Sequence, residues 1–116
     1  MEDENKLVQQ QNDTFRKNAF SAGLEGIKGK AVMTQGIAAM SYQDQLEIYK
    51  KVQDFNIFNE NNDPYGEHDF GAFEYNGQKI FWKIDLYDTN YTYGSEQPHD
   101  LKQTRRVLTV MLASEY

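Results

Sequence analysis

The sequence predicts an α+β fold in which two or three helices pack against a small antiparallel sheet centred on a β-hairpin. Two observations carry this prediction: Asn76-Gly77 stands between two aromatic-rich runs, and a capped amphipathic segment precedes it at 42–54. Asn-Gly between apolar runs is the strongest short-range signal for a two-residue hairpin turn. We expect 1–116 to form a single domain with a frayed N-terminus of a few residues.

The composition limits the class of protein. With 116 residues, of which 39% are hydrophobic, the chain is long enough to bury one core. It has no cysteine, which excludes disulfides, zinc-thiolate sites and thiol catalysis. No segment resembles a signal peptide or a membrane span, so we expect a cytoplasmic protein without a membrane partner.

Charge is unevenly distributed along the chain. Eighteen acidic and twelve basic residues give a net charge of −6, which argues against direct binding of nucleic acid. Residues 54–74 contain six acids and residues 85–100 contain four, and neither stretch has a lysine or arginine. Because both stretches flank the hairpin, we expect one end of the molecule to be negative.

The first third of the chain predicts a helix and then a short strand. Apolar residues such as Val8 and Phe15 stand at loosely helical spacing in a polar, glutamine-rich stretch, which indicates a helix at 5–17. After a glycine-punctuated segment, the run KAVMTQ at 30–35 is predicted to form a short strand that ends at Gly36.

The clearest helix is predicted at 42–54. Ser41 with Asp44 three residues later matches a capping box, which marks a helix start. Leu46, Tyr49 and Val52 then form one apolar stripe at helical spacing. The following stretch, at 56–66, is too rich in Asn, Asp, Pro and Gly for regular structure, so we expect a loop there.

The hairpin strands are predicted at about 69–75 and 78–87. A two-residue turn fixes the register, so that Phe73 faces Ile80 and Gly71 faces Trp82. We expect Trp82 to be buried against the helix at 42–54 and a last helix at 101–114. A glycine opposite it would let the indole lie across the neighbouring strand.

The last segment predicts a third helix at 101–114. Asp100 is a suitable N-cap, and Leu101, Leu108 and Met111 lie on one side of a helix. The run RVLTVML is also compatible with a strand, but the cap and the length of the segment favour a helix.

One histidine suggests chemistry. Outward extension of the hairpin places His68 opposite Asp85, and we favour a structural hydrogen bond between them. The alternative is an enzyme acting on a nucleotide or nucleic acid through His68, Asp85 and Glu67, or a metal site formed by His68, Asp85 and Asp88. Adjacent strand residues point to opposite faces, which opposes convergence of Glu67 with His68.

Three passages in order, VMTQGIAA at 32–39, NDPYGEHDFGAF with IFWKID at 62–85, and TYGSE with TRRVLTVMLASEY at 92–116, resemble a bacterial family catalogued as domain of unknown function 3768. The resemblance covers roughly residues 7–116. It implies no established activity, cofactor or catalytic residue. It also implies a gene carried by mobile genetic elements, beside antirestriction genes.

We therefore favour a small acidic, non-catalytic interaction protein without a cofactor. Its partner is expected to be a protein with a basic surface, such as a restriction or CRISPR-type host-defence complex that it would inhibit. The predicted contact residues are the acids of the two loops: Glu60, Asp63, Glu67, Asp88 and Glu96.

Overall fold

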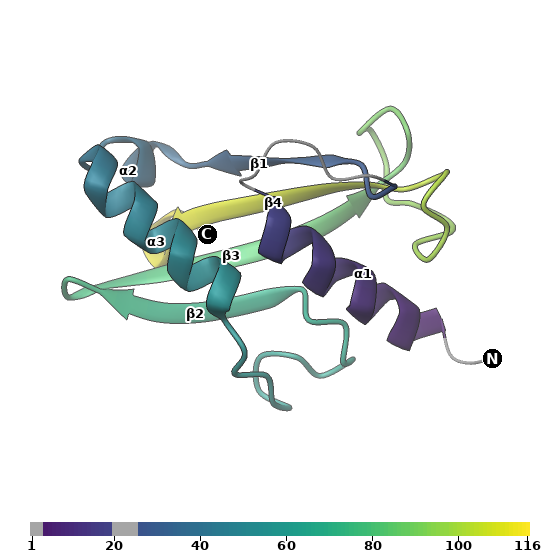
Figure 1. Ribbon diagram of the computed structural model, residues 1–116, viewed down its shortest axis with the longest axis horizontal. Coiled ribbons are helices and arrows are strands. Elements are labelled where there is room, and N and C mark those ends of the chain that lie inside the picture. Colours follow the sequence, from purple (N-terminus) through teal and green to yellow (C-terminus); the bar gives the residue numbers. More distant parts are fainter. Residues whose placement is uncertain (1–3, 20–25) are drawn as a thin grey trace.

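The computed structural model describes residues 4–19 and 26–116, so the predicted fraying of the first few residues lies outside the described part (Figure 1). The elements follow in the order α1 (Glu4–Asn18), β1 (Gly29–Met33), α2 (Gln35–Ala38), α3 (Tyr42–Asp54), β2 (Phe70–Tyr75), β3 (Gln78–Tyr87), β4 (Arg105–Leu112) and the 3₁₀ turn η1 (Ala113–Glu115). The fold is α+β, as predicted.

The four strands form one sheet in the order β1-β4-β3-β2. β2 pairs with β3, and β3 with β4, in antiparallel fashion, whereas β1 runs parallel to β4. The sheet is therefore mixed rather than antiparallel. The strand at β1 was predicted without a partner, because its partner β4 was expected to be a helix.

The predicted hairpin register is confirmed. Phe73 pairs with Ile80, and Gly71 pairs with Trp82. Asn76 and Gly77 both have positive φ, 50° and 79°, as a type I′ turn requires. The turn chemistry and the alternation of apolar residues specify the same register, so a local signal was sufficient here.

The prediction of a helix at 101–114 is wrong. Asp100 caps only a short turn, in which its carboxylate accepts hydrogen bonds from the backbone of Lys102 and the side chain of Gln103. The chain then enters β4, whose buried and half-buried residues alternate from Arg105 to Val110. β3 and β1 pair with β4 on its two sides, and this non-local pairing overrides the local helix signal.

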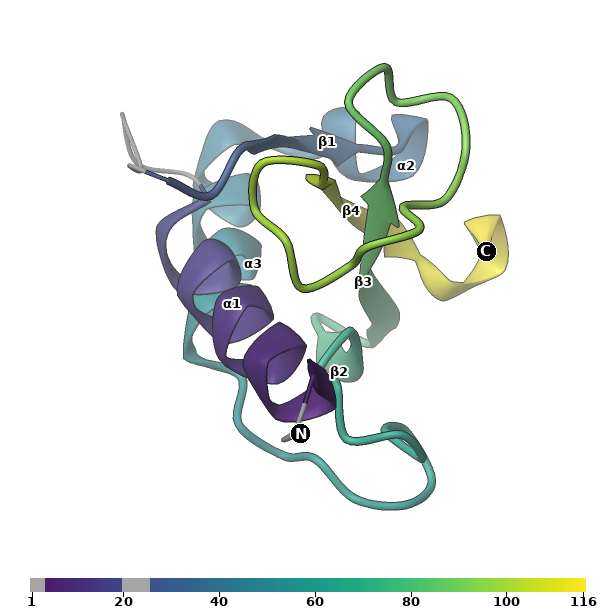
Figure 2. The ribbon, with the colours of Figure 1, turned by 90° about the vertical axis from the view of Figure 1, so that its right-hand side faces the viewer.

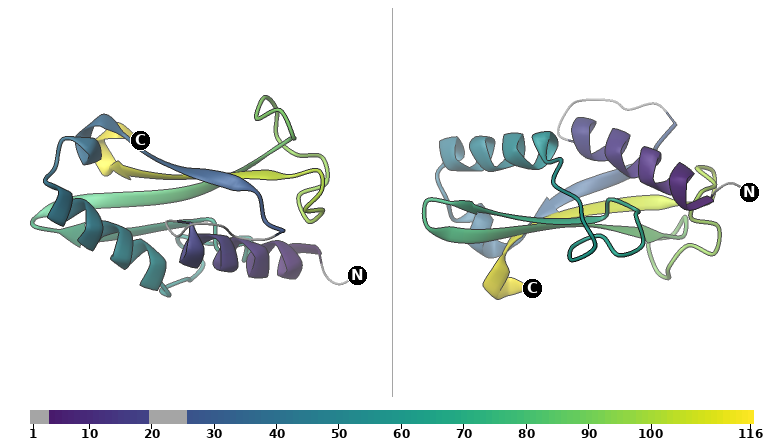
Figure 3. Two further views of the ribbon diagram at one scale, coloured as in Figure 1. Left: turned by 45° about the horizontal axis from the view of Figure 1, so that its top comes forward. Right: turned by 90° about the horizontal axis from the view of Figure 1, so that it is seen from below.

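The helices α1 and α3 cover the same face of the sheet, and the C-terminal turn lies on the other side (Figures 2 and 3). The side chain of Ser41 accepts a hydrogen bond from the backbone of Asp44, which confirms the predicted cap of α3. α3 buries Ile48 and Val52, whereas Leu46 of the predicted stripe is exposed. The core joins this helix face to the sheet residues Ile80, Trp82, Ile84, Leu108 and Val110.

Gly71 leaves space that the indole of Trp82 occupies. A Cβ at this position would overlap the Trp82 ring and lie 2.8 Å from the ring of Phe55. We expect Gly71→Ala to lower the free energy of unfolding by about 1 to 3 kcal/mol, the usual effect of overpacking. Urea denaturation measures this loss. Gly94→Ala is the matched control, because its Cβ would meet only the Leu86 carbonyl oxygen at 4.0 Å; equal losses in both variants would contradict the expectation.

Candidate functional site

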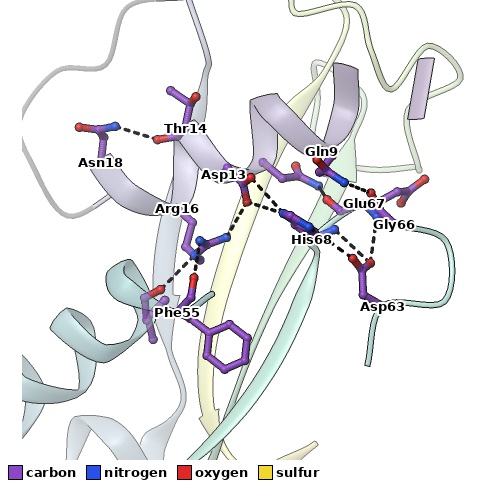
Figure 4. Close-up of polar contacts among 12 residues, drawn as sticks. Gln9, Asp13, Thr14, Arg16, Asn18, Phe55, Asp63, Gly66, Glu67 and His68 are labelled. Atoms are coloured by element: carbon purple, nitrogen blue, oxygen red, sulfur yellow. Dashed lines mark hydrogen bonds and ion pairs between the residues drawn. The ribbon is translucent and has the colours of Figure 1, made fainter. Parts of the chain in front are cut away.

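His68 belongs to the loop that precedes β2, and its side chain faces α1 (Figure 4). Its Nδ1 is 2.9 and 3.0 Å from the two carboxylate oxygens of Asp13, and its Nε2 is 3.7 Å from Oδ2 of Asp63. The ring of Phe58 stacks on the imidazole, with 3.8 Å between centroids. Both ring nitrogens therefore face carboxylates, and these contacts link the loop before β2 to α1.

The predicted hydrogen bond between His68 and Asp85 is wrong. His68 has a φ of 55°, outside the extended region, so the chain leaves the ladder before the position opposite Asp85. The last hairpin contact on this side is the Ile84 N–H donating to the Asp69 carbonyl. Asp85 instead forms an ion pair with Lys83, 3.0 Å away on its own strand.

The residues considered for catalysis or metal binding do not come together. Asp85 is held by Lys83 on the sheet face opposite Trp82, whereas His68 contacts α1, which covers the Trp82 face. Within residues 4–19 and 26–116, no three His, Asp or Glu side chains are placed to hold a metal ion. Glu67 remains near His68, and burial, with Asp69 and Asp63 nearby, raises the pKa of its carboxyl.

Two of the acids predicted to contact a partner serve the fold of their own loops. Asp63 is only 8% exposed, and its Oδ1 accepts hydrogen bonds from the backbone N–H groups of Glu67 and His68. Asp88 accepts from the backbone of Asn90 and Thr92, and these bonds lower the pKa of its carboxyl. Short Asp side chains commonly stabilise turns in this way.

The expected single acidic end is divided between two regions. Asp88 and Glu96 belong to the loop between β3 and β4, whereas Glu60 and Glu67 belong to the loop before β2. Figures 1 and 2 place these loops well apart, with α1 between them. The loop acids Glu60 and Glu96 therefore lie in separate regions. Asp69 and Asp85 of the two stretches are nevertheless close enough to interact, and burial together with this repulsion raises the pKa of the Asp69 carboxyl.

Residues 56–69 form a loop, the 56–69 loop, whose conformation is stabilised by its own polar groups. Asn59 and Asn62 bond the backbone within the turn: the Asn59 N–H donates to Asn62 Oδ1, and Asn62 Nδ2 donates to the Ile57 carbonyl, at 2.9 and 2.8 Å. The Asp63 N–H donates to the Asn59 carbonyl. The sequence predicts only an irregular loop here, although asparagine and aspartate at this density are typical of side chain–backbone turns.

Helix α1 fastens the 56–69 loop to the body of the protein. Gln9 Nε2 donates to the Gly66 carbonyl at 2.7 Å, and Asn12 Nδ2 donates to the Glu67 carbonyl at 2.9 Å (Figure 4). Asn12 also accepts from the buried guanidinium of Arg106 at 2.7 Å, which ties α1 to β4. The glutamine-rich start of the chain is therefore a polar docking face, and this was missed because its partners are distant in sequence.

The exposed side chains of the 56–69 loop differ from those that hold it. Tyr65 is 78% exposed, and Glu60 is also exposed. Glu67 is half-buried, with its backbone engaged by α1. A loop held by its own polar groups and by α1 thus presents the side chains of Tyr65 and Glu60 to solvent.

In the part of the chain that the structure describes, no helix has the length and apolar character needed to cross a bilayer. Searches of curated proteins and of solved structures each return no match. A family model does match, over residues 33–115, which include α2, α3, the hairpin and β4 but not α1. This match spans most of the sequence and confirms the resemblance noted above. The chain therefore belongs to the family described as protein of unknown function (DUF3768).

Proposed function

We propose that this protein is a non-catalytic interaction protein that binds a partner protein with a basic surface through the 56–69 loop. The observation that supports this proposal is the fixed shape of the loop combined with the exposure of Tyr65 and Glu60. A loop that is already ordered loses little conformational entropy on binding. Exposed tyrosine is also among the side chains that most often dominate binding energy.

The acidic groups of the loop favour a partner whose surface is basic. Glu60 is exposed at the loop surface and Glu67 is half-buried, and residues 54–74 contain no lysine or arginine. Such a surface accelerates association with a basic one. Of the five predicted contact acids, Glu60 and Glu67 therefore form this proposed surface, Glu96 lies on the other loop, and Asp63 and Asp88 hold their own turns.

We further propose that the partner is a restriction or CRISPR-type host-defence complex, which the protein inhibits on behalf of a mobile genetic element. Such complexes hold nucleic acid in basic grooves. An acidic loop with an aromatic side chain at its surface is chemically suited to occupy a groove of that kind.

Binding to purified complexes of these two classes, immobilised on a biosensor, tests the proposal. We expect Tyr65→Ala to raise the Kd about tenfold, and Glu60→Lys to lower the on-rate severalfold and flatten its dependence on salt. Both variants should keep the free energy of unfolding within about 0.5 kcal/mol, because the two side chains are exposed.

Glu74→Lys is the control, since it makes the same charge change on the exposed surface of β2, outside the loop. If Glu60→Lys and Glu74→Lys alter the on-rate equally, only net charge matters and the 56–69 loop is not the interface. Absence of binding to every complex tested would remove the host-defence part of the proposal.

A further inference from the structure

A groove of about 640 Å³ runs between the C-terminal half of α3 and strand β2. Phe55, Ile57 and Phe73 supply its apolar lining, and the α3 side carries two acids and two lysines: Glu47, Lys50, Lys51 and Asp54. Ile57 is 66% exposed and Phe73 is half-buried, so apolar side chains of the lining are open to solvent here. The volume lies within the range of about 300 to 1,000 Å³ typical of ligand sites.

Strand β2 borders this groove and is an edge strand of the sheet. The Ile84 N–H donates to the Asp69 carbonyl, so Asp69 and alternate residues after it direct their peptide groups toward β3. By the same alternation, Phe70, Ala72 and Glu74 direct theirs outward. The side chains of Ala72 and Phe73 lie on opposite faces of the sheet. Ala72 still lines the groove, because the Ala72 backbone faces outward from the sheet edge.

The two lysines of the groove differ in their partners. Lys50 forms an ion pair with Asp54 at 3.4 Å. Lys51 is exposed and has no ion pair among the described residues. The remaining acid, Glu47, accepts hydrogen bonds from the side chains of Gln43 and Tyr75 at 3.4 Å. Lys51 is therefore the charged group of the lining that is left to meet a ligand, and its ammonium favours a carboxylate.

We propose that this groove binds an extended peptide segment of another protein, which adds to β2 as a fifth strand. The peptide backbone pairs with the outward groups of Ala72 and its alternate neighbours, an apolar side chain enters between Phe55, Ile57 and Phe73, and an acidic side chain meets Lys51. Strand addition of this kind draws affinity from the backbone and specificity from the pocket. The inference goes beyond the proposed function, because it concerns a different surface and a different ligand.

A second copy of this chain fits the groove less well. Antiparallel pairing of two β2 strands about Ala72 places Glu74 of one copy opposite Phe70 of the other. These side chains lie on the sheet face opposite Phe73, so the acid would not reach Lys51. Within β2 of a second copy, Glu74 is the acid, and in this register it lies on the face away from Lys51.

Selection of random heptapeptides displayed on phage against the immobilised protein provides the probe. We expect enrichment of peptides with alternating apolar residues and at least one acid. The enriched sequences, synthesised with a fluorescein label, are then titrated by fluorescence anisotropy. Ala72→Pro should weaken their binding at least about tenfold, because proline removes the outward N–H, whereas Ala72→Val, which keeps it, should bind as the parent does.

Proline is tolerated on edge strands where the N–H faces solvent, so Ala72→Pro is expected to fold, and circular dichroism verifies this. If Ala72→Pro does not fold, Lys51→Glu takes its place, with Lys50→Glu as the matched control. Of these two variants, only Lys51→Glu should abolish binding of acidic peptides.

Lack of enrichment, or equal affinity in each variant and its control, overturns the proposal. A dimer in sedimentation that Ala72→Pro dissolves also overturns it, in favour of a second copy. Glu60→Lys and Tyr65→Ala change the 56–69 loop but not the groove, so both variants should bind the selected peptides as the parent does. The peptide test can therefore succeed or fail independently of the loop proposal.

Discussion

Replacement of Trp82 by alanine is expected to lower the free energy of unfolding by about 3 to 5 kcal/mol, as truncation of a large buried aromatic does. Trp82 is 0% exposed at the centre of the sheet. The ring of Phe55 packs edge-on against it at 5.5 Å, and the guanidinium of Arg16 lies 5.0 Å from it. Alanine would leave a cavity beneath both α1 and α3, which rigid elements cannot fill by collapse.

Urea denaturation followed by far-ultraviolet circular dichroism measures this loss, since the variant lacks the only tryptophan. Trp82→Phe serves as the comparison, because it keeps much of the volume. It also removes an indole N–H that has no hydrogen-bond acceptor among the described residues. We expect this change to cost less than about half as much as Trp82→Ala. A loss below about 1 kcal/mol for alanine would show that the helices do not cover this face.

Replacement of Arg16 by methionine is expected to cost about 3 to 5 kcal/mol, the range found when one partner of a buried charged network is removed. Arg16 is 1% exposed and reaches from α1 to the end of α3. Its Nε and Nη2 donate to the carbonyls of Val52 and Phe55 at 3.0 and 2.9 Å, and Nη1 contacts Asp13 at 3.1 Å (Figure 4). Methionine keeps the apolar stem but leaves these acceptors without a donor.

Lys17→Met is the matched control, because it removes the same charge from an exposed neighbour on the same helix. Its effect should stay within about 0.5 kcal/mol. Thermal denaturation of the two variants gives the comparison. Similar melting temperatures would mean that helix α1 contributes little to the stability of α3.

The elements predicted correctly have signals confined to a few neighbouring residues. Asn76-Gly77 determines the hairpin register, and Ser41 with Asp44 determines where α3 begins. β4 was missed because the features that decide it, pairing with β3 and β1, come from distant segments. Asp100 does accept the hydrogen bonds of a cap, but the helical turn that follows it is only one turn long.

The same distinction applies to the candidate site. Asp63 and Asp88 bond backbone groups two to five residues away, so their structural role was accessible from local turn chemistry. Asp13 was not identified as the partner of His68, because 55 residues separate them. The positive φ of His68, which directs its side chain toward α1, has no local sequence signal.

Beside its contacts with the side chains of His68 and Arg106, helix α1 holds the 56–69 loop and the end of α3 through main-chain oxygen atoms. Gln9, Asn12 and Arg16 all donate to carbonyl groups, of Gly66, Glu67, Val52 and Phe55. Every amino acid supplies a carbonyl, so mutations at these acceptor positions leave the docking bonds available. Selection can therefore diversify the outward residues of the 56–69 loop while the helix keeps the loop in place, as a framework does for a variable recognition surface.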